Sequence, residues 1–349
     1  MKFNNLINVY KNKRKQAIIN NISPDFSYKY AFVGVGQHSL STFYPILIYL
    51  NTPVKYIFTE KSHYATQMAL KFPNAKATHD YEEILADPEV KGLFICGNPA
   101  NHFQLTSKAL LHNKDVFVEK PVCFKYEELK ELISICKSYC VVGLQKRFST
   151  INTIIKKNYS NPVYYSSRYA IGAYPEGNAL INLFIHPIDN LIYLFGKANI
   201  VYHTKIQNKN NVIYSLHLKH ENGIIGTLEL STDHNWNMPI DTLRLELLNE
   251  TVLIHYPGYI ESTPKEKNIL GIPFNKILQN PITKSIIYNN NGSLQTIEKN
   301  ILYEAGFFNE VKDFIAFVEG NESTKKPKNS IHQLINTYEL LDYLFLEKK

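Results

Sequence analysis

The chain has 349 residues, of which 44% are hydrophobic and 20% charged. These values are typical of a folded protein of two domains and exclude a long disordered region. The formal net charge of +7 is a mild excess spread along the chain. It is typical of a solvated surface, and the alternative is a basic face that attracts phosphorylated or acidic small molecules. Because the spacings of zinc fingers and of basic-region zippers are absent, we expect no nucleic-acid partner.

The cysteines and the first residues indicate a cellular location. The four cysteines, Cys96, Cys123, Cys136 and Cys140, form no CxxC pair, which is typical of free thiols in a reducing compartment and predicts no metal site. Residues 1–23 contain no apolar run of the kind that a secretory signal needs. No stretch approaches the ~18 apolar residues of a membrane-spanning helix. We therefore expect a cytoplasmic protein with no membrane partner.

The chain begins with a short extension. Apolar residues between Phe3 and Ile18 recur with roughly helical spacing, and Lys11 to Lys15 supply a basic outer face. The segment Ser23-Pro24-Asp25 then breaks the helix. Residues 1–27 are therefore predicted to form an N-terminal helical extension.

Residues 28–146 alternate between apolar strands and helical segments. Strands are expected over 30–36, 54–58, 92–96, 115–119 and 140–143, with helices over 39–50, 62–72, 80–85, 100–112 and 125–137. Asp80 stands where the cap of the short third helix belongs. Strands that alternate with helices predict right-handed crossovers and a doubly wound parallel sheet.

Residues 147–349 follow another pattern. Strands are expected over 163–170, 200–206, 212–220, 224–230 and 241–247, with helices over 179–195, 304–318 and 331–346 and a long loop over 265–281. The turn Glu221-Asn222-Gly223 predicts a hairpin. This half is therefore expected to be an α/β domain with a mainly antiparallel, open sheet.

A glycine turn follows the first strand, in the run Gly34-Val35-Gly36-Gln37-His38-Ser39. The first glycine permits a tight turn, and the second lets the backbone approach a pyrophosphate at the helix N-terminus. Ser39 replaces the third glycine of the usual pattern and is still small. The motif is also compatible with a glycine-rich turn in another kind of α/β protein, but the strand–helix alternation around it favours NAD or NADP.

The end of the second strand bears on the choice of coenzyme. An acid there binds the adenosine ribose hydroxyls; Glu60 is the candidate, and Thr59 is the competing alignment. Lys61 would instead suit the 2′-phosphate of NADP. Glu60 favours NAD. The alternative is that these residues form a solvent-exposed turn without a role in coenzyme binding.

The segment Val116–Pro121 ends a predicted buried strand with Glu119 and Lys120. Ligands bind at the carboxyl ends of strands in doubly wound sheets, so Lys120 is expected at the cofactor cleft. A partly desolvated lysine has a lowered pKa and can exchange protons near neutral pH. The alternative is an exposed Glu-Lys turn.

The helix expected over 179–195 is apolar around most of its circumference and should be buried. His186 on this helix is therefore either a core histidine with internal hydrogen bonds or a group that faces a cavity. Pro187 removes one helical hydrogen bond and is expected to bend the helix.

With these motifs in place, the chain resembles the glucose–fructose oxidoreductase, inositol dehydrogenase and rhizopine-catabolism (Gfo/Idh/MocA) oxidoreductases. The matching segments, in chain order, are Gly34–Gly36, Tyr81–Val90, the helix around His102, Lys114–Pro121, Val142–Phe148 and Phe184–Asp189. The resemblance implies a Rossmann domain, followed by a domain whose open sheet often forms oligomer contacts.

The resemblance also implies site residues. The family's catalytic lysine falls on Lys120 and its catalytic histidine on His186, whereas its partner aspartate is replaced by Asn182. Asn182 can orient a hydroxyl but carries no charge, and Asp189 is a candidate to supply that charge. The residues expected near the cofactor are Gly34, Gly36, Gln37, His38, Glu60, Gly97, Asn98, His102, Glu119, Lys120 and Gln145. Arg147 is either structural or a contact to an anionic substrate.

The function implied is NAD(P)-dependent hydride transfer at a hydroxyl or carbonyl of a sugar, cyclitol or nucleotide-sugar-like substrate. A homo-oligomer through the C-terminal sheet is expected. Two alternatives remain: a catalytically silent cofactor-binding scaffold or sensor, and elimination or glycoside cleavage assisted by bound NAD.

Overall fold

The structure is a computed structural model. It describes residues 2–22, 26–59, 62–266, 268–273, 283–290, 301–320 and 327–346. The chain forms two compact units, and each is built from several segments. Unit 1 comprises Met1–Val122, Ser134–Val141 and Val311–Pro327; unit 2 comprises Cys123–Ile133, Val142–Glu310 and Lys328–Lys349.

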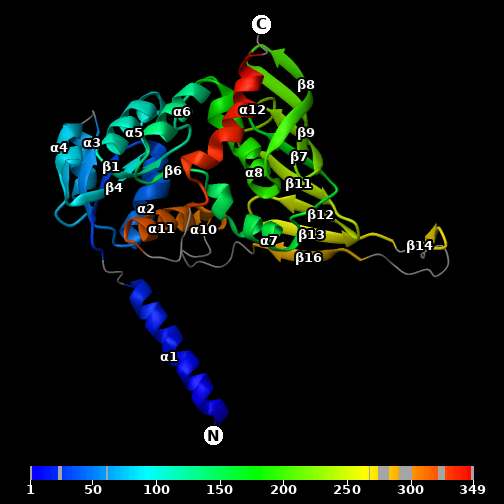
Figure 1. Cartoon of the computed structure of the whole chain (residues 1–349), viewed down its shortest axis with the longest axis horizontal. Helices are drawn as coiled ribbons and strands as arrows, with labels where there is room; N and C mark the ends of the chain where they lie inside the picture. The colour runs from blue at the N-terminus through cyan, green and yellow to red at the C-terminus, as the bar shows by residue number, and fades with distance from the viewer. Residues whose placement is uncertain are drawn as a thin grey trace. The chain divides into compact units, whose positions relative to one another are not determined.

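Unit 1 contains a six-stranded sheet in the order β3-β2-β1-β4-β5-β6 (Figure 1). The strands are β1 (Lys29–Val33), β2 (Val54–Phe58), β3 (Lys76–Thr78), β4 (Val90–Ile95), β5 (Asp115–Val118) and β6 (Cys140–Val142). Strand β1 pairs in parallel with both β2 and β4. The order reverses at β1, which is typical of a Rossmann sheet and confirms the predicted doubly wound fold.

Helices connect these strands. They are the π-helix η1 (Ser39–Phe43), α2 (Tyr44–Tyr49), α3 (Ser62–Ala69), α4 (Tyr81–Ala86), the 3₁₀ turn η2 (Pro99–Asn101), α5 (His102–Leu111) and α6 (Tyr126–Ile135). Asp80 caps α4 as predicted, because its carboxylate accepts from the backbone N–H groups of Glu82 and Glu83 at 2.9 and 3.3 Å.

The core of unit 1 is rich in phenylalanine. Phe94 of β4 lies 5.8 Å from Phe32 and 5.5 Å from Phe117 between ring centroids. Phe314 lies 5.1 Å from Phe94 and 5.9 Å from Phe117. Phe314 belongs to α11 (Phe307–Val318), whose residues from Val311 onward are part of unit 1. A single boundary after residue 146 therefore does not describe the units, because aromatic packing brings this later segment back.

The N-terminal extension is a helix, α1 (Lys2–Ile22). Its described side chains, residues 5–16, are all exposed, and these include Leu6, Ile7, Val9 and Tyr10. The expected apolar face is therefore not covered by protein over this stretch. Among the described residues, no helix combines the length and the apolar character needed to cross a membrane.

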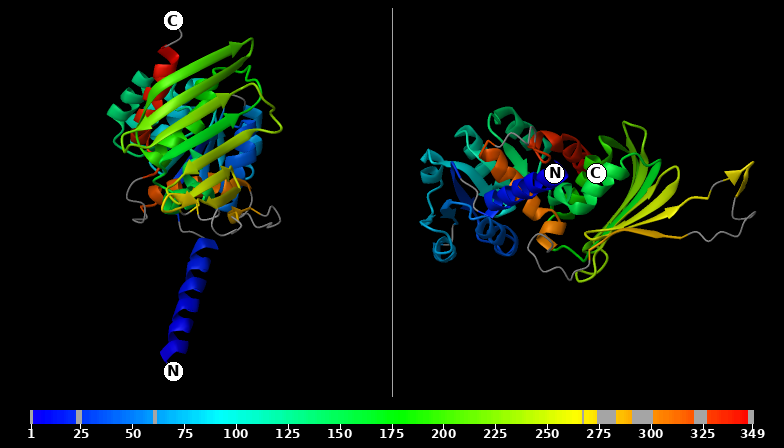
Figure 2. Two further views of the ribbon diagram at one scale, coloured as in Figure 1. Left: turned by 90° about the vertical axis from the view of Figure 1, so that its right-hand side faces the viewer. Right: turned by 90° about the horizontal axis from the view of Figure 1, so that it is seen from below.

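Unit 2 contains an eight-stranded sheet in the order β16-β13-β12-β11-β7-β10-β9-β8 (Figure 2). The strands are β7 (Tyr164–Ala170), β8 (Ala198–Asn208), β9 (Asn211–His220), β10 (Ile225–Ser231), β11 (Ile240–Glu246), β12 (Glu250–His255), β13 (Tyr259–Pro264) and β16 (Ser285–Asn289). Only β7 and β10 pair in parallel among the described strands of this sheet. The predicted β9–β10 hairpin forms, with Gly223 at φ 91°.

Further elements complete unit 2. Its helices are η3 (Gln145–Phe148), α7 (Thr150–Asn158), η4 (Leu180–Phe184), α8 (Ile185–Phe195), α10 (Ile301–Glu304), η6 (Ile331–Leu334) and α12 (Ile335–Leu346). The predicted long loop contains a small ribbon, β14 (Asn268–Ile269) with β15 (Ile272–Pro273); residues 267 and 274–281 lie outside the described part. The predicted loop therefore contains a short antiparallel strand pair.

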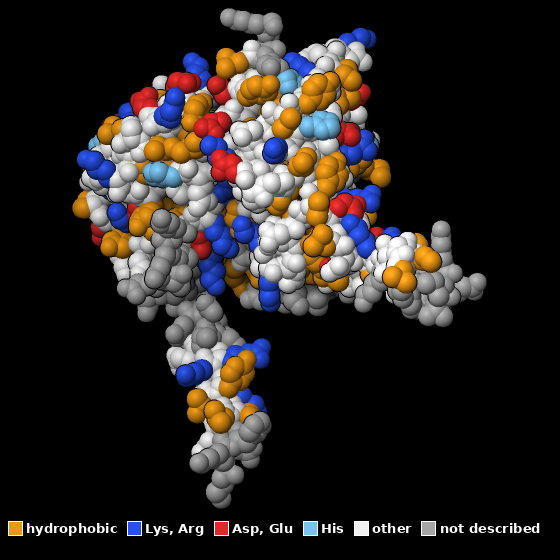
Figure 3. Space-filling model, turned by 45° about the vertical axis from the view of Figure 1, so that its right-hand side comes forward, with side chains coloured by type: hydrophobic (Ala, Val, Ile, Leu, Met, Phe, Trp, Pro, Cys, Tyr) orange, Lys and Arg blue, Asp and Glu red, His pale blue; other side chains and the backbone are white. Residues whose placement is uncertain are grey.

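One face of the large sheet is covered by helices. Tyr165 of β7 stacks on Phe195 of α8 at 5.0 Å between centroids, and Asn336 of α12 bonds both backbone groups of Ala198 in β8. No described helix or strand of unit 2 covers the opposite face. Figure 3 shows hydrophobic side chains, in orange, scattered over that part of the surface among polar and charged ones.

Candidate functional site

The glycine turn after β1 joins two strand ends. Gly34 has φ 107°, and a Cβ added to it would lie 2.6 Å from Cys96 O and 2.7 Å from Gly97 Cα. Only glycine fits this close approach between the ends of β1 and β4. A Cβ on Gly36 would meet no protein atom within 4 Å. The backbone at Gly36 therefore borders open space.

Ser39 fills the place of the third glycine. Its side chain is buried, and its hydroxyl donates to Cys96 O at 2.9 Å. This bond ties the first helical turn after the glycines to the end of β4. A small side chain at this position therefore allows the close packing that the sequence predicts, and adds a hydrogen bond to it.

A cavity of about 400 Å³ opens at this turn, within the range of small-molecule sites. Its lining includes six predicted cofactor residues: Gly34, Gly36, Gln37, His38, Gly97 and Asn98. It lies where β1 and β4 end, at the reversal of strand order. Open space at Gly36 beside the start of η1 suits a pyrophosphate. The residues present therefore fit the diphosphate of a dinucleotide.

The cavity is also lined by Thr59, the competing alignment for Glu60, and by Phe58, Asn101 and Leu105, which the sequence did not indicate as cofactor residues. Phe58 is the last residue of β2, and Thr59 follows it. Asn101 ends η2, and Leu105 lies in α5. Asn101 and Leu105 are four residues apart and so share a helical face, a spacing that could have revealed them. Glu60 and Lys61 lie outside the described residues.

His102 lies beneath the wall of the cavity rather than in its lining. Its side chain is buried, with Nδ1 2.8 Å from Pro121 O and Nε2 3.2 Å from Gly97 O. Burial lowers the pKa of His102, and its backbone hydrogen bonds oppose this change. His102 therefore links the ends of β4 and β5, which positions Gly97 at the cavity.

The end of β5 brings ionisable groups together. Glu119 is buried, and burial raises its pKa to about 7, although the positive charge of Lys120 opposes the shift. Burial lowers the pKa of Lys120, and Glu119 opposes that change. His38 Nε2 lies 4.0 Å from Glu119 Oε1, and burial followed by the charge of Lys120 lowers the pKa of His38. Burial therefore favours the uncharged form of each of these three groups.

The helix that carries His186 belongs to unit 2 and begins irregularly. Its first turns form the π-helix η4, and regular α8 starts at Ile185. Pro187 lies in the first turn of α8, where a missing N–H is tolerated. The irregular turn lies just before Pro187 and contains Leu183, the residue four positions earlier whose carbonyl a proline ring displaces, so its position agrees with the predicted disturbance of the helix.

His186 and Asn182 are half-buried on this otherwise buried helix. The four-residue spacing places them on one side of it. A Cβ added to Gly177 would lie 2.7 Å from Asn182 Nδ2, so the carboxamide packs against the preceding loop. Gln145 begins η3 in unit 2, whereas the cavity belongs to unit 1; its part in cofactor binding stays a prediction.

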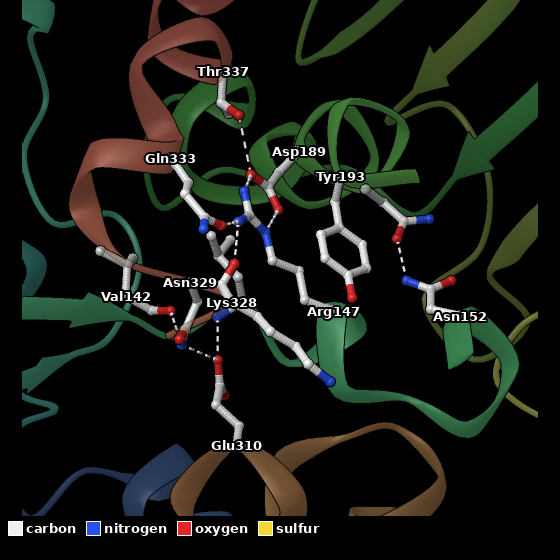
Figure 4. Close-up of polar contacts among 12 residues, drawn as sticks. Val142, Arg147, Asn152, Asp189, Tyr193, Glu310, Lys328, Asn329, Gln333 and Thr337 are labelled. Carbon is white, nitrogen blue, oxygen red and sulfur yellow. Dashed lines mark hydrogen bonds and ion pairs between the residues drawn. The ribbon is translucent and has the colours of Figure 1, made fainter. Parts of the chain in front are cut away.

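Arg147 is structural, which decides between the two roles left open for it. Its guanidinium is buried and donates through Nε and Nη2 to the two carboxylate oxygens of Asp189. Nη1 donates to Lys328 O and Gln333 Oε1, and Thr337 donates to Asp189 (Figure 4). Because Asp189 is engaged in this network, the structure gives it a role other than the suggested partner of His186.

The fold and the cavity together define a dinucleotide-binding α/β protein with an added open-sheet unit. Residues 28–145 match the GFO_IDH_MocA family, described as "Oxidoreductase family, NAD-binding Rossmann fold". Residues 28–145 therefore belong to the NAD-binding Rossmann part of this Gfo/Idh/MocA oxidoreductase family.

Two relatives illustrate the similarity in sequence. The oxidoreductase YhhX of Escherichia coli (strain K12) is 27% identical over 193 residues, which is 49% of this chain and 54% of YhhX. The scyllo-inositol 2-dehydrogenase (NAD(+)) of Bacillus subtilis (strain 168) is 29% identical over 161 residues, or 41% of this chain and 47% of that protein. The matches thus span about half the length of these relatives.

Solved structures share the fold over nearly the whole chain. A dehydrogenase from Chromobacterium violaceum has a TM-score of 0.79 at 16% identity, covering 93% of this chain and 96% of the other. UDP-N-acetylglucosamine 3-dehydrogenase GnnA from Acidithiobacillus ferrooxidans has a TM-score of 0.71 at 15% identity, covering 91% and 96%. KijD10, a 3-ketoreductase from Actinomadura kijaniata in complex with TDP-benzene and NADP, has a TM-score of 0.69 at 13% identity. The match covers 90% of this chain and 96% of the other. At these identities the likeness shows the fold alone.

Proposed function

We propose that the protein is an NAD(P)-dependent oxidoreductase that acts on a CH–OH group of a sugar, cyclitol or nucleotide-sugar-like substrate. The observation that carries this proposal is the cavity at Gly34 and Gly36, which fits a dinucleotide's diphosphate beside the strand end that bears Lys120. The bound coenzyme supplies the hydride chemistry. The protein's own residues bind and orient the substrate and the coenzyme, and they exchange protons with the substrate.

Lys120 and His186 are the groups proposed to move the hydroxyl proton. The lowered pKa of Lys120 supports a role in proton exchange near neutral pH, and His186 has the type of side chain that most often does this work. Asn182 shares the side of the helix with His186 and is proposed to hold a substrate hydroxyl through its carboxamide. Asn182 cannot hold a negative charge beside His186.

The substrate class is supported by the names of two similar proteins. One is a dehydrogenase of scyllo-inositol and the other of UDP-N-acetylglucosamine. Both act on a ring that carries hydroxyl groups. The coenzyme is proposed to be NAD or NADP: Glu60 favours NAD, while the KijD10 complex holds NADP.

The uncovered face of the eight-stranded sheet supports the proposal of a homo-oligomer. Tyr164, Ile225 and Tyr202 are exposed there, and Arg168 pairs with Glu229 beside them at 2.9 Å. Exposed apolar side chains with charged neighbours are typical of a surface that a second copy can cover. Size-exclusion chromatography with light scattering tests this: a monomeric mass would contradict it.

A second candidate, a cofactor-binding scaffold without turnover, is favoured by Asn182 in place of the family's aspartate. Turnover distinguishes the two. The purified chain is incubated with NAD or NADP and a panel of inositols, aldoses and nucleotide sugars, and the absorbance of the reduced nicotinamide is followed. Reduction with at least one substrate supports the oxidoreductase. Coenzyme binding without reduction across the panel supports the scaffold.

A further inference from the structure

A second cavity, of about 170 Å³, lies in unit 2 on the helix-covered side of the large sheet. The loop before η4 forms one wall and strands β8 and β9 form the other. Its lining residues are Tyr174, Gly177, Asn178, Ala179, Leu180, Lys205, Gln207, Asn210, Val212, Tyr214 and Thr232. None of the residues in the sequence-predicted site lines it.

The lining is rich in hydrogen-bond donors. It contains one lysine, three carboxamides and two tyrosines, and none of these described lining residues is acidic. Lys205 and Tyr214 are paired across β8 and β9, with the ammonium nitrogen 5.7 Å from the ring centroid. The carboxamide oxygen of Asn178 accepts from Leu180 N at 2.9 Å, so its NH₂ is the part that can donate to a ligand. Such a lining suits an anionic, oxygen-rich group.

The cavity adjoins the helix face that carries Asn182 and His186. Gly177 lines the cavity and lies against Asn182, since an added Cβ there would be 2.7 Å from Asn182 Nδ2. Asn182 is four residues before His186 on the same side of the helical segment. A molecule held by these two side chains can therefore extend past Gly177 into the cavity.

We propose that this cavity binds an anionic group of the substrate, a phosphoryl or a carboxylate, at a distance from the carbon that reacts. This inference rests on the proposed function. The volume is below the roughly 300 Å³ at the lower end of whole-ligand sites, so the cavity takes one group rather than a complete substrate. Lys205 supplies the positive charge, and the carboxamides and tyrosine hydroxyls bind the remaining oxygens.

The test compares sugars that differ in charge. Isothermal titration calorimetry measures the binding of glucose, glucose 1-phosphate and glucuronate to the whole chain, with and without NAD. Wild-type protein is expected to bind at least one anionic sugar about tenfold more tightly than glucose, the value of one charge-assisted hydrogen bond. The phosphate and glucuronate arms distinguish the two anionic groups.

Variants assign the preference to the cavity. Lys205 is exposed, so Lys205→Gln should fold; it is expected to abolish the tenfold preference, and Lys205→Arg to keep it. Lys219→Gln is the matched control, because Lys219 is exposed on β9 on the opposite side of the same sheet. Equal binding of the three sugars by wild type, or a preference that survives Lys205→Gln, would overturn the inference. The turnover assay with NAD or NADP decides the proposed function separately, so the two failures are distinguishable.

Discussion

Asp189 accepts hydrogen bonds from the buried guanidinium of Arg147 through both of its carboxylate oxygens. Asp189 lies three residues after His186 on α8. The same guanidinium reaches Lys328 O and Gln333 at the start of the C-terminal helices. One ion pair therefore joins the helix of His186 to η3 and to the last segment of the chain. Removing one partner of a fully buried ion pair lowers the free energy of unfolding strongly, because the remaining charge has no water around it.

Asp189→Asn is expected to lower the free energy of unfolding by about 3–5 kcal/mol, because it leaves the buried guanidinium without its counter-charge. Urea denaturation followed by circular dichroism measures the change. Glu82→Gln is the matched control: Glu82 pairs with Lys108, and the two side chains are 58% and 56% exposed, so its expected cost is at most about 1 kcal/mol. Equal costs for the two variants would contradict the structural role.

Gly34 and Gly36 are expected to respond differently to alanine. Gly34→Ala places a methyl group against Cys96 O and forces a left-handed backbone on alanine, which costs about 1–3 kcal/mol from conformation alone. Gly36→Ala meets no protein atom, so stability should change by less than about 1 kcal/mol. Its methyl group occupies the space of the pyrophosphate, and coenzyme affinity should fall at least about tenfold.

Thermal denaturation and coenzyme titration of both variants check this contrast. A Gly36→Ala protein that binds NAD(P) as wild type does would show that the ligand does not approach the turn.

Glu119 is expected to make stability depend on pH. Its pKa is raised from 4.5 to about 7 by burial, so the folded protein keeps a proton that the unfolded chain releases. Stability therefore falls as pH rises from about 4.5 through 7. The two pKa values set an upper limit of about 3 kcal/mol on this loss.

Glu119→Gln removes the group that titrates. Unfolding free energies of wild type and variant, measured from pH 4.5 to 8.5, should diverge in favour of the variant as pH rises. Parallel pH profiles for the two proteins would contradict the raised pKa.

Lys120→Met is expected to lower kcat by about 10²- to 10⁴-fold, the range that general acid–base assistance contributes. Methionine keeps the length of the apolar stem, so the variant should fold and bind coenzyme. Lys125→Met, at an exposed position five residues later, serves as the control. Wild-type turnover in Lys120→Met would remove Lys120 from the proposed mechanism.

The sequence predicted the elements in which local pattern and tertiary packing agree. Strand β2 has the predicted bounds, Val54–Phe58, because four of its five residues are apolar and a strand covered on both faces needs apolar side chains. Helix α7 was not predicted: its sequence contains several β-branched residues, which favour strands. It forms because Ser149 caps it and Ile151 and Ile155 are buried.

Contacts between distant segments could not be predicted. The return of α11 to unit 1 depends on Phe314 packing against Phe94 and Phe117, and no local pattern signals it. The role of Arg147 was undecided for the same reason, since Asp189 is 42 residues away and Thr337 is further still. Six of the predicted cofactor residues line one cavity because they follow strand ends and belong to a spaced glycine motif, which local sequence reveals; their contact with a coenzyme stays a prediction.

The most direct test of the account is a calorimetric titration of the intact chain with NAD and with NADP. We predict saturable binding of at least one coenzyme, at one site per chain. Heats that show no binding of either coenzyme would contradict the central claim that the turn at Gly34 and Gly36 holds a dinucleotide.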